Sequence, residues 1–413
     1  MRVTSSSAVP EVAGASRVQR NNERLLDAAV NIAANEGWAA LTFVRVADRS
    51  GLSRRPLQDR YADASNMMAA LWRERCEPVL AGVIERSLAA SGISSSGSSQ
   101  AFVNELEVVV DPDESLRAAA ELLMIAQFDS TVREAVVSTL GVKAATWCDP
   151  ASADGDAAEA GKARAAQNAY VVSVVLGLLV FGRRAVTTGQ NFTEPFETLY
   201  RALHDPASPA RLPKDDFAHL DRPVPFETGD ATTDALLQST LDAVGVNGYD
   251  QMSVDRIAQG AGSSQGALFA RYPTKLSLFI DATRRQNGLA ARINAAAIGQ
   301  LEQRYGGGIA EAVAIREFQR PFRASLRAIT LEGIRVAWHD DDLRQAVIDE
   351  LAAYEAEVAE ADPSGYRSSG WFHFGFAIGV GVLILPILHE PCWRLPYDVV
   401  TVSLLATHAA LTD

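Results

Sequence analysis

Apolar residues in the second half of the chain recur at the spacing of an α-helix. Between residues 235 and 246 the apolar residues follow the spacing of one helical face: Leu236, Leu237, Leu241 and Val244. This pattern predicts an amphipathic helix, and Gly245 and Gly248 are expected to end it. Alanine is abundant along the chain and strand-favouring runs are few. The sequence therefore predicts an all-α fold.

Two shorter helices separated by a glycine are predicted next. Ser253 is a candidate N-cap for a helix that extends to about Gly260. Gly262 can adopt a positive φ in a tight turn, and Ser264 can cap a third helix that extends to about Arg271. A helix followed by a short helix, a glycine turn and a second short helix is the helix-turn-helix pattern, whose last helix enters the major groove of DNA.

The same pattern occurs earlier in the chain. Thr42 corresponds to Ser253, Gly51 to Gly262, Leu57 to Leu268 and Arg60-Tyr61 to Arg271-Tyr272, and each pair is 211 positions apart. Residues 115–117 also resemble 325–327, and residues 132–136 resemble 343–347. Glycine-containing apolar helices are predicted around Gly177 and around Gly379. A repeat of this length predicts two domains in tandem.

The repeat and the intervening prolines predict the domain boundaries. We expect two helix-turn-helix heads at 17–63 and 228–274, each followed by a helical regulatory domain, at 64–205 and 275–413. Residues 206–227 are rich in proline and are predicted to form an extended linker. Residues 91–100 and 149–160 are rich in small residues and are predicted to be loops.

Charge is distributed unevenly. The formal net charge is −13, which argues against indiscriminate coating of nucleic acid. The first head nevertheless carries five arginines between residues 42 and 60, against Asp48 and Asp59: Arg45, Arg49, Arg54, Arg55 and Arg60. A basic tip on an acidic body would orient the protein on DNA.

The second motif is specific enough to suggest a family. Residues 264–275, which read SQGALFARYPTK, resemble the recognition helix and the start of the next helix in the tetracycline-repressor (TetR/AcrR) family. The family usually has a tyrosine where Phe269 stands. The first unit resembles the family less closely, with Pro56 in the first turn, Gln58 in place of the usual aromatic residue, and Ala64 in place of the lysine that matches Lys275. The resemblance implies that this lysine contacts a backbone phosphate.

DNA-binding residues are expected in both heads. In the first they are Thr42, Arg45, Ser53, Arg54, Arg55 and Gln58. In the second they are Ser253, Ser264, Gln265, Gly266, Ala267, Phe269 and Lys275. The alternative for any one arginine is a solvated helix face. Arg60 and Arg271 are the weakest candidates, because they lie at the far end of the recognition helix.

By the same resemblance, the helices after each head enclose a small-molecule pocket and form a dimer interface. The helices around Gly177 and Gly379/Gly381 suit the interface, because glycine allows close approach of helix backbones. Candidate pocket residues are Met124, Phe128, Trp147, Trp338 and His339. Ordinary core packing is the alternative for each of them.

No catalytic or metal-binding pattern is recognisable. The six histidines are scattered without metal-ligand spacing, and no phosphate-binding loop or nucleophile elbow occurs. The three cysteines do not suggest a disulfide framework and fit a reducing cytosol. We therefore expect no cofactor, no metal and no enzymatic activity, and a helical enzyme is the remote alternative.

Residues 371–388 are nearly unbroken apolar sequence, close to the minimum length of a membrane span. The corresponding run at 169–181 is too short to span, so buried helices are the preferred interpretation and no membrane partner is expected. Residues 1–19 lack an apolar segment of the kind found in signal peptides. A cytoplasmic protein is predicted.

Together these observations predict a sequence-specific DNA-binding transcriptional regulator. The resemblance implies a repressor released by a small-molecule effector. One monomeric chain is expected to act as a pseudo-dimer on an asymmetric double-stranded operator. The alternative is a protein-interaction regulator of the same fold whose heads no longer bind DNA.

Overall fold

The computed structural model describes residues 17–93, 96–149, 156–181, 191–210, 212–213, 225–361 and 369–412. Within these ranges the regular elements are all helical and no strand occurs, so the predicted all-α fold is confirmed. Most of the signal-peptide prediction concerns residues 1–16, which lie outside the described residues, as do parts of the predicted linker and of the loop at 149–160.

The helices of the first half follow the order expected for a head and a body. The head contains α1 (Arg17–Glu36), α2 (Phe43–Ser50) and α3 (Arg55–Arg60). The body contains α4 (Ala64–Leu71), α5 (Glu77–Ala90), α6 (Ser99–Val110), α7 (Glu114–Ile125), α8 (Ser130–Val136), α9 (Val142–Cys148), α10 (Asp156–Phe181) and α11 (Thr193–His204). A π-helical turn joins α4 to α5 and another joins α8 to α9, at Trp72–Cys76 and Val137–Gly141.

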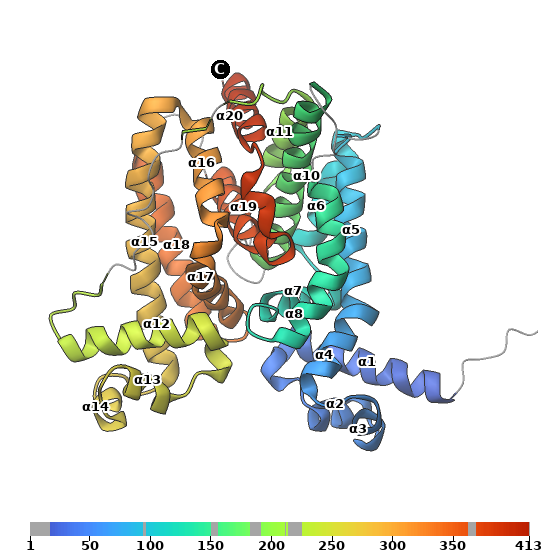
Figure 1. Ribbon diagram of the computed structural model, residues 1–413, viewed down its shortest axis with the longest axis vertical. Coiled ribbons are helices and arrows are strands. Elements are labelled where there is room, and N and C mark those ends of the chain that lie inside the picture. The colour runs from blue at the N-terminus through green and yellow to red at the C-terminus, as the bar shows by residue number, and fades with distance from the viewer. Residues whose placement is uncertain are drawn as a thin grey trace, which may run out of the picture.

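The second half repeats this order. Its head contains α12 (Ala231–Gln251), α13 (Val254–Gly260) and α14 (Gln265–Phe269). Its body contains α15 (Lys275–Tyr305), α16 (Gly307–Gln319), α17 (Ala324–Ala337), α18 (Asp341–Ala361), α19 (Ser369–Leu388) and α20 (Asp398–Thr412). Figure 1 shows α2 and α3 at the same end of the molecule as α13 and α14.

Of the two glycines predicted to end the first helix of the second head, Gly248 does so and Gly245 does not. Gly245 does not end α12, which continues to Gln251. A Cβ on Gly245 would lie 2.5 Å from Ser325 Oγ, so this glycine permits close packing of α12 against α17. The chain leaves helical geometry only at Gly248, where φ is 71° and ψ is 167°. The predicted loop at 149–160 is also shorter than expected, because α10 begins at Asp156.

The helices that contain the predicted interface glycines pack closely against each other. α10 lies along α19 and α11 packs against α20, and Figure 1 shows these helices in the middle of the molecule. A Cβ on Gly177 would lie 1.8 Å from the carbonyl oxygen of Ala377, and one on Gly381 would lie 1.7 Å from that of Ser173. Gly379 has no atom within 4 Å of the same position, so Gly381 and not Gly379 marks the crossing.

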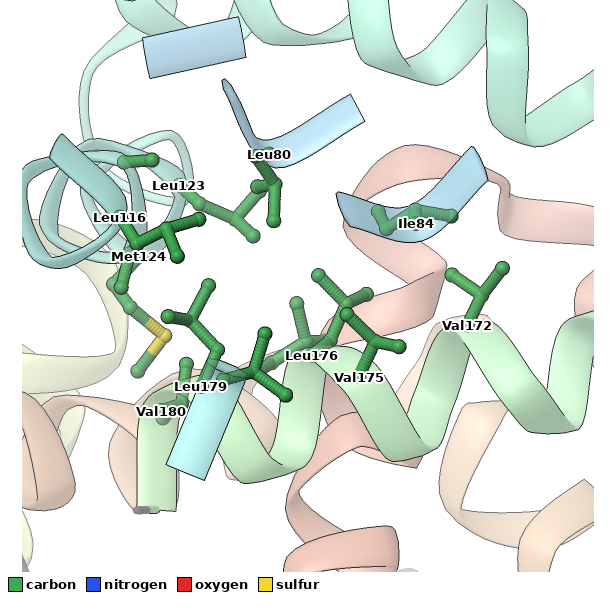
Figure 2. Packing of buried hydrophobic residues seen from close by; sticks show 14 of the residues in the cluster. Leu80, Ile84, Leu116, Leu123, Met124, Val172, Val175, Leu176, Leu179 and Val180 are labelled. Carbon is green, nitrogen blue, oxygen red and sulfur yellow. The ribbon is translucent and has the colours of Figure 1, made fainter. Parts of the chain in front are cut away.

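The core of the first half lies among α5, α7 and α10. Figure 2 shows side chains from these three helices packed against each other: Leu80, Ile84, Leu116, Leu123, Met124, Val172, Val175, Leu176, Leu179 and Val180. Met124 is fully buried in this cluster. The position of Met124 agrees with the alternative interpretation, that it is an ordinary core residue.

Among the described residues, two helices are long and apolar enough to cross a membrane, Ala158–Phe181 and Gly370–Leu388. The first is longer than the apolar run at 169–181 suggested, so the prediction that it is too short to span was wrong. Within the protein, 89% and 72% of the apolar windows are buried. Since α10 and α19 cover each other, core helices account for both, and their hydrophobicity is weak grounds for a membrane span.

Candidate nucleic-acid interface

The first head is built around a glycine turn. The Thr42 side chain accepts a hydrogen bond from the Arg45 N–H and caps α2, and Gly51 ends this helix in the left-handed region at φ 67°. The predicted cap of the recognition helix was wrong. Arg54, not Ser53, is the N-cap of α3, and no side-chain hydrogen bond caps it. Pro56 occupies the first turn, where the missing N–H has no intrahelical partner in any case.

The second head follows its predicted pattern more closely. Ser253 caps α13 by accepting from the Arg256 N–H, and Ser264 caps α14 by accepting from the Ala267 N–H. Gly262 has φ 60° in the turn between them. α14 ends at Phe269 rather than near Arg271, so this recognition helix is shorter than predicted.

Acidic side chains already hold several arginines of the first head. Glu36 pairs with both Arg45 and Arg49, at 2.6 and 2.5 Å. Arg60 pairs with Glu74 at 2.7 Å, in keeping with its low rank as a DNA contact. The sequence did not point to these partners, because Glu36 and Glu74 lie on helices outside the motif.

Arg54 and Arg55 remain the most available cations of this head. Arg55 is 87% exposed and forms only a long pair of 3.7 Å with exposed Asp59. Arg54 forms no ion pair with any residue that the structure describes, and it is exposed. Gln58 is exposed on the same short helix. These three residues form the surface of the first head that can approach a base edge.

The second head presents a less charged surface. Gln265 is exposed and its amide donates to the Asp255 carboxylate, while Gly266 is exposed and Ala267 is half-buried. Phe269 is 48% exposed, which is unusual for a large apolar side chain. Arg271 donates to Asp230 at 2.7 Å.

Lys275 lies at the start of α15 but does not point freely into solvent. Its Nζ lies 3.1 Å from the Tyr249 carbonyl oxygen and 3.3 Å from that of Met252, and 4.2 Å from the centre of the Tyr249 ring. Burial lowers its pKa, and the nearby Asp250 charge partly opposes that shift. The ammonium group therefore binds the carbonyls at the end of α12, and a phosphate would have to share it.

Comparison with known families supports this geometry. Residues 236–282 match the family model of bacterial regulatory proteins, tetR family. The match extends from within α12 to the first turns of α15 and so includes the whole helix-turn-helix motif. No curated protein matches the chain.

The five candidate pocket residues are not brought together in the structure. Trp338 and His339 line a small cavity with Glu121 and Arg117. Met124 lies in the core, and Phe128 packs against Gly248 of the opposite half. Trp147 is half-buried on α9, and its carbonyl accepts a hydrogen bond from Asn168. These five residues therefore do not form a single pocket.

Glu121, which lines that cavity, was not among the residues predicted from the sequence. Glu121 stands in the apolar run AAAELLMIA, and its side chain is only 1% exposed. A lone carboxylate within an apolar helix face could have been recognised, because such a group needs a buried partner. Within the described ranges, no cluster of histidine, cysteine, aspartate and glutamate could hold a metal ion.

Proposed function

We propose that this tetR-type protein is a sequence-specific transcriptional regulator whose two heads bind two half-sites from one chain. The observation that carries the proposal is the family match on the second head, together with the same order of helices in the first. A tetR-type head supports DNA binding; the contribution of the first head, a repressor role, an effector and a cytoplasmic location are parts of the proposal.

The two halves would act as an intramolecular pseudo-dimer. The close crossing of α10 and α19 at Gly177 and Gly381 supports this, because each half lends one helix to a shared interface. An interface already occupied within one chain leaves little driving force for a second chain. Light scattering is therefore expected to give the monomer mass of 44.3 kDa, whereas twice that mass would contradict the proposal.

Regulation would act through the helices that follow the recognition helices. α4 begins four residues after α3, and α15 begins six residues after α14. A small molecule that shifts α4 or α15 would therefore change the placement of a head and reduce the population that fits DNA. Binding of candidate effectors is expected to lower affinity for the selected operator in a direct binding assay.

A selection of bound genomic DNA fragments tests the central proposal. The wild-type chain should enrich a defined site, and Arg54→Ala/Arg55→Ala should reduce that enrichment. Arg201→Ala is the matched control, since Arg201 is an exposed arginine on α11, which Figure 1 shows at the end of the molecule opposite to the heads. Absence of any enriched site would contradict DNA recognition.

One observation favours a second candidate function. The second head exposes Phe269 and has its best-placed cation, Lys275, bound to backbone carbonyls. An exposed aromatic side chain is typical of protein contacts. In that case the second head would bind a protein, and only the first would bind DNA. Enrichment of a single half-site, insensitive to Gln265→Ala, would favour this alternative.

A further inference from the structure

A buried ionic group connects the two halves beneath the heads. Arg335 of α17 donates to Glu121 of α7 at 2.8 Å and to Glu332 at 2.8 Å. It also donates to Asp250, which follows the turn of α12, at 2.6 Å. The Arg335 side chain is 3% exposed, and both glutamates are 1% exposed. One guanidinium group therefore serves three carboxylates from both halves of the chain.

The two glutamates occupy equivalent positions in the repeat. Glu121 accepts from the Trp38 N–H at 2.9 Å, and Glu332 accepts from the Tyr249 N–H at 2.6 Å. Both the carboxylates and the N–H groups are 211 positions apart. Each N–H follows a positive-φ glycine at the end of the first helix of its head, with φ 83° at Gly37 and 71° at Gly248.

The cation is not repeated. The position equivalent to Arg335, 211 residues earlier, holds Met124. A face formed from two copies of the first half would therefore bury two glutamates without an arginine. Removing the partner of a buried charge is strongly destabilising, because an uncompensated charge remains in a medium of low dielectric. The neighbouring packing also crosses between halves: the ring of His339 lies against Gly37, and that of Phe128 lies against Gly248.

We propose that Arg335 is a pairing determinant, which makes the first half complementary to the second half and not to another copy of itself. The partner surface of Glu121 is the α17 face of the same chain, already in contact with α7. This inference rests on the proposed pairing of the two halves but not on DNA binding. The same ionic group would also connect the two heads, since Glu121 and Glu332 each accept a hydrogen bond from the backbone of one head.

The charges of the bridge make the stability of the protein depend on pH in a way that a purely packing role of Arg335 would not. Burial by itself would raise the pKa of Glu121, but the Arg335 charge and the hydrogen bonds from His339 and Trp38 outweigh it and lower the pKa. A depressed pKa contributes stability above the unfolded value near 4.3, and that stability is lost only as pH falls through the folded pKa. The ionised Glu121 carboxylate of the wild-type bridge should therefore contribute a constant stabilisation between pH 5 and 8.

In Arg335→Met the shift in the pKa of Glu121 should have the opposite sign. Glu121 would be buried without its cation, so its pKa would rise above the unfolded value. Its neutral form would then favour the folded state, and stability would increase as pH falls from 8 to 5. The other charged groups near the bridge are Asp250, His339 and Arg117, and they are unchanged in every variant compared.

The experiment measures thermal unfolding of the full chain between pH 5 and 8. Arg335→Met should lower Tm at pH 8 by about 5 °C and should gain stability on acidification. In Arg335→Met/Glu121→Gln/Glu332→Gln, at least half of that loss should be recovered and the added pH dependence should vanish. Arg285→Met, which removes an exposed arginine paired with Asp281, is the control and should change Tm by no more than about 2 °C.

Each result of these measurements either supports or contradicts the role of Arg335 in pairing the two halves. If Arg335→Met does not fold but the triple variant does, the charge balance is what the interface requires. A triple variant no more stable than Arg335→Met, or a pH slope like that of wild type, would overturn the inference and leave Arg335 as a packing residue. Light scattering on the same samples separates the two proposals, because a wild-type dimer would refute the pairing of halves whatever the unfolding data show.

Discussion

Single residues decide how much charge each head can offer to DNA. In the first head, Arg45 and Arg49 are exposed but pair with Glu36, whereas Arg54 has no ion pair among the described residues and Arg55 has only a 3.7 Å pair with Asp59. In the second, Lys275 binds the carbonyls of Tyr249 and Met252. Motif spacing predicts that these residues lie near DNA, and local ion pairs and hydrogen bonds compete with that contact.

Lys275→Ala tests whether its ammonium group serves DNA as well as the α12 carbonyls. If Lys275 contacts a phosphate, the variant should bind all sequences more weakly, and the slope of log affinity against log salt should flatten by about one unit. Arg54→Ala, in the other head, is the comparison. A fall in unfolding free energy with an unchanged salt slope would show that Lys275 is a helix cap only.

The cysteines should not react with alkylating reagents in the folded protein. Cys76, Cys148 and Cys392 are all buried; burial raises the pKa of Cys148 to about 12 and shifts those of the other two in the same direction. Since the thiolate is the reactive form, alkylation at pH 8 should label no cysteine in the native state and all three in denaturant. Mass spectrometry after a short pulse would measure this. Rapid native labelling of Cys148 would contradict the burial of α9.

At the scale of helices, glycine placement determines how closely α10 and α19 approach. Gly177 and Gly381 each face a carbonyl oxygen of the opposite helix, whereas Gly379, two residues away, faces open space. The apolar pattern alone does not distinguish Gly379 from Gly381. Helix rotation places one in the contact and the other outside it.

Gly381→Ala and Gly379→Ala form a matched pair. The first would place a methyl group 1.7 Å from the Ser173 carbonyl oxygen, so the helices must separate, and we expect a loss of about 1–3 kcal/mol or more. The second meets nothing within 4 Å and should be neutral or stabilising by up to about 1 kcal/mol, because alanine favours a helix over glycine. Chemical denaturation measures both, and equal effects would contradict the described crossing.

At the scale of the whole molecule, fusion of the halves permits the two heads to differ. A homodimer must present identical recognition helices and therefore binds a palindrome. Here one head presents Arg54, Arg55 and Gln58, and the other presents Gln265 and Ala267. Arginine favours guanine edges, while glutamine favours adenine. The operator should therefore be asymmetric, with the guanine-rich half under the first head.

Binding-site selection with Arg55→Ala and Gln265→Ala tests this asymmetry. Each variant should relax base preference in one half-site only, at a cost of about 1–3 kcal/mol. The separation of half-sites should stay near one helical turn or a small multiple, as the shared body sets it. A perfect palindrome, or an equal effect of either variant on both halves, would mean that the heads come from two chains.

Local sequence patterns were enough to predict the helical class, the repeat and most features of the heads. Helical periodicity, N-capping residues and positive-φ glycines act within a few residues of each other, so Thr42, Ser253, Ser264 and Gly51 could be assigned correctly from local pattern. The cap of α3 could not, because Pro56 and the preceding turn shift the helix start to Arg55.

Contacts between groups that are distant in the sequence could not be predicted, because they depend on how the helices pack. Glu121 and Arg335 are 214 positions apart, and no local pattern links a carboxylate on α7 to a guanidinium group on α17. The same is true of Glu36 with Arg45, of Gly381 with Ser173, and of Met124, whose burial depends on α5 and α10. Local propensity acts along the chain, but burial and charge compensation depend on which helices the fold packs together.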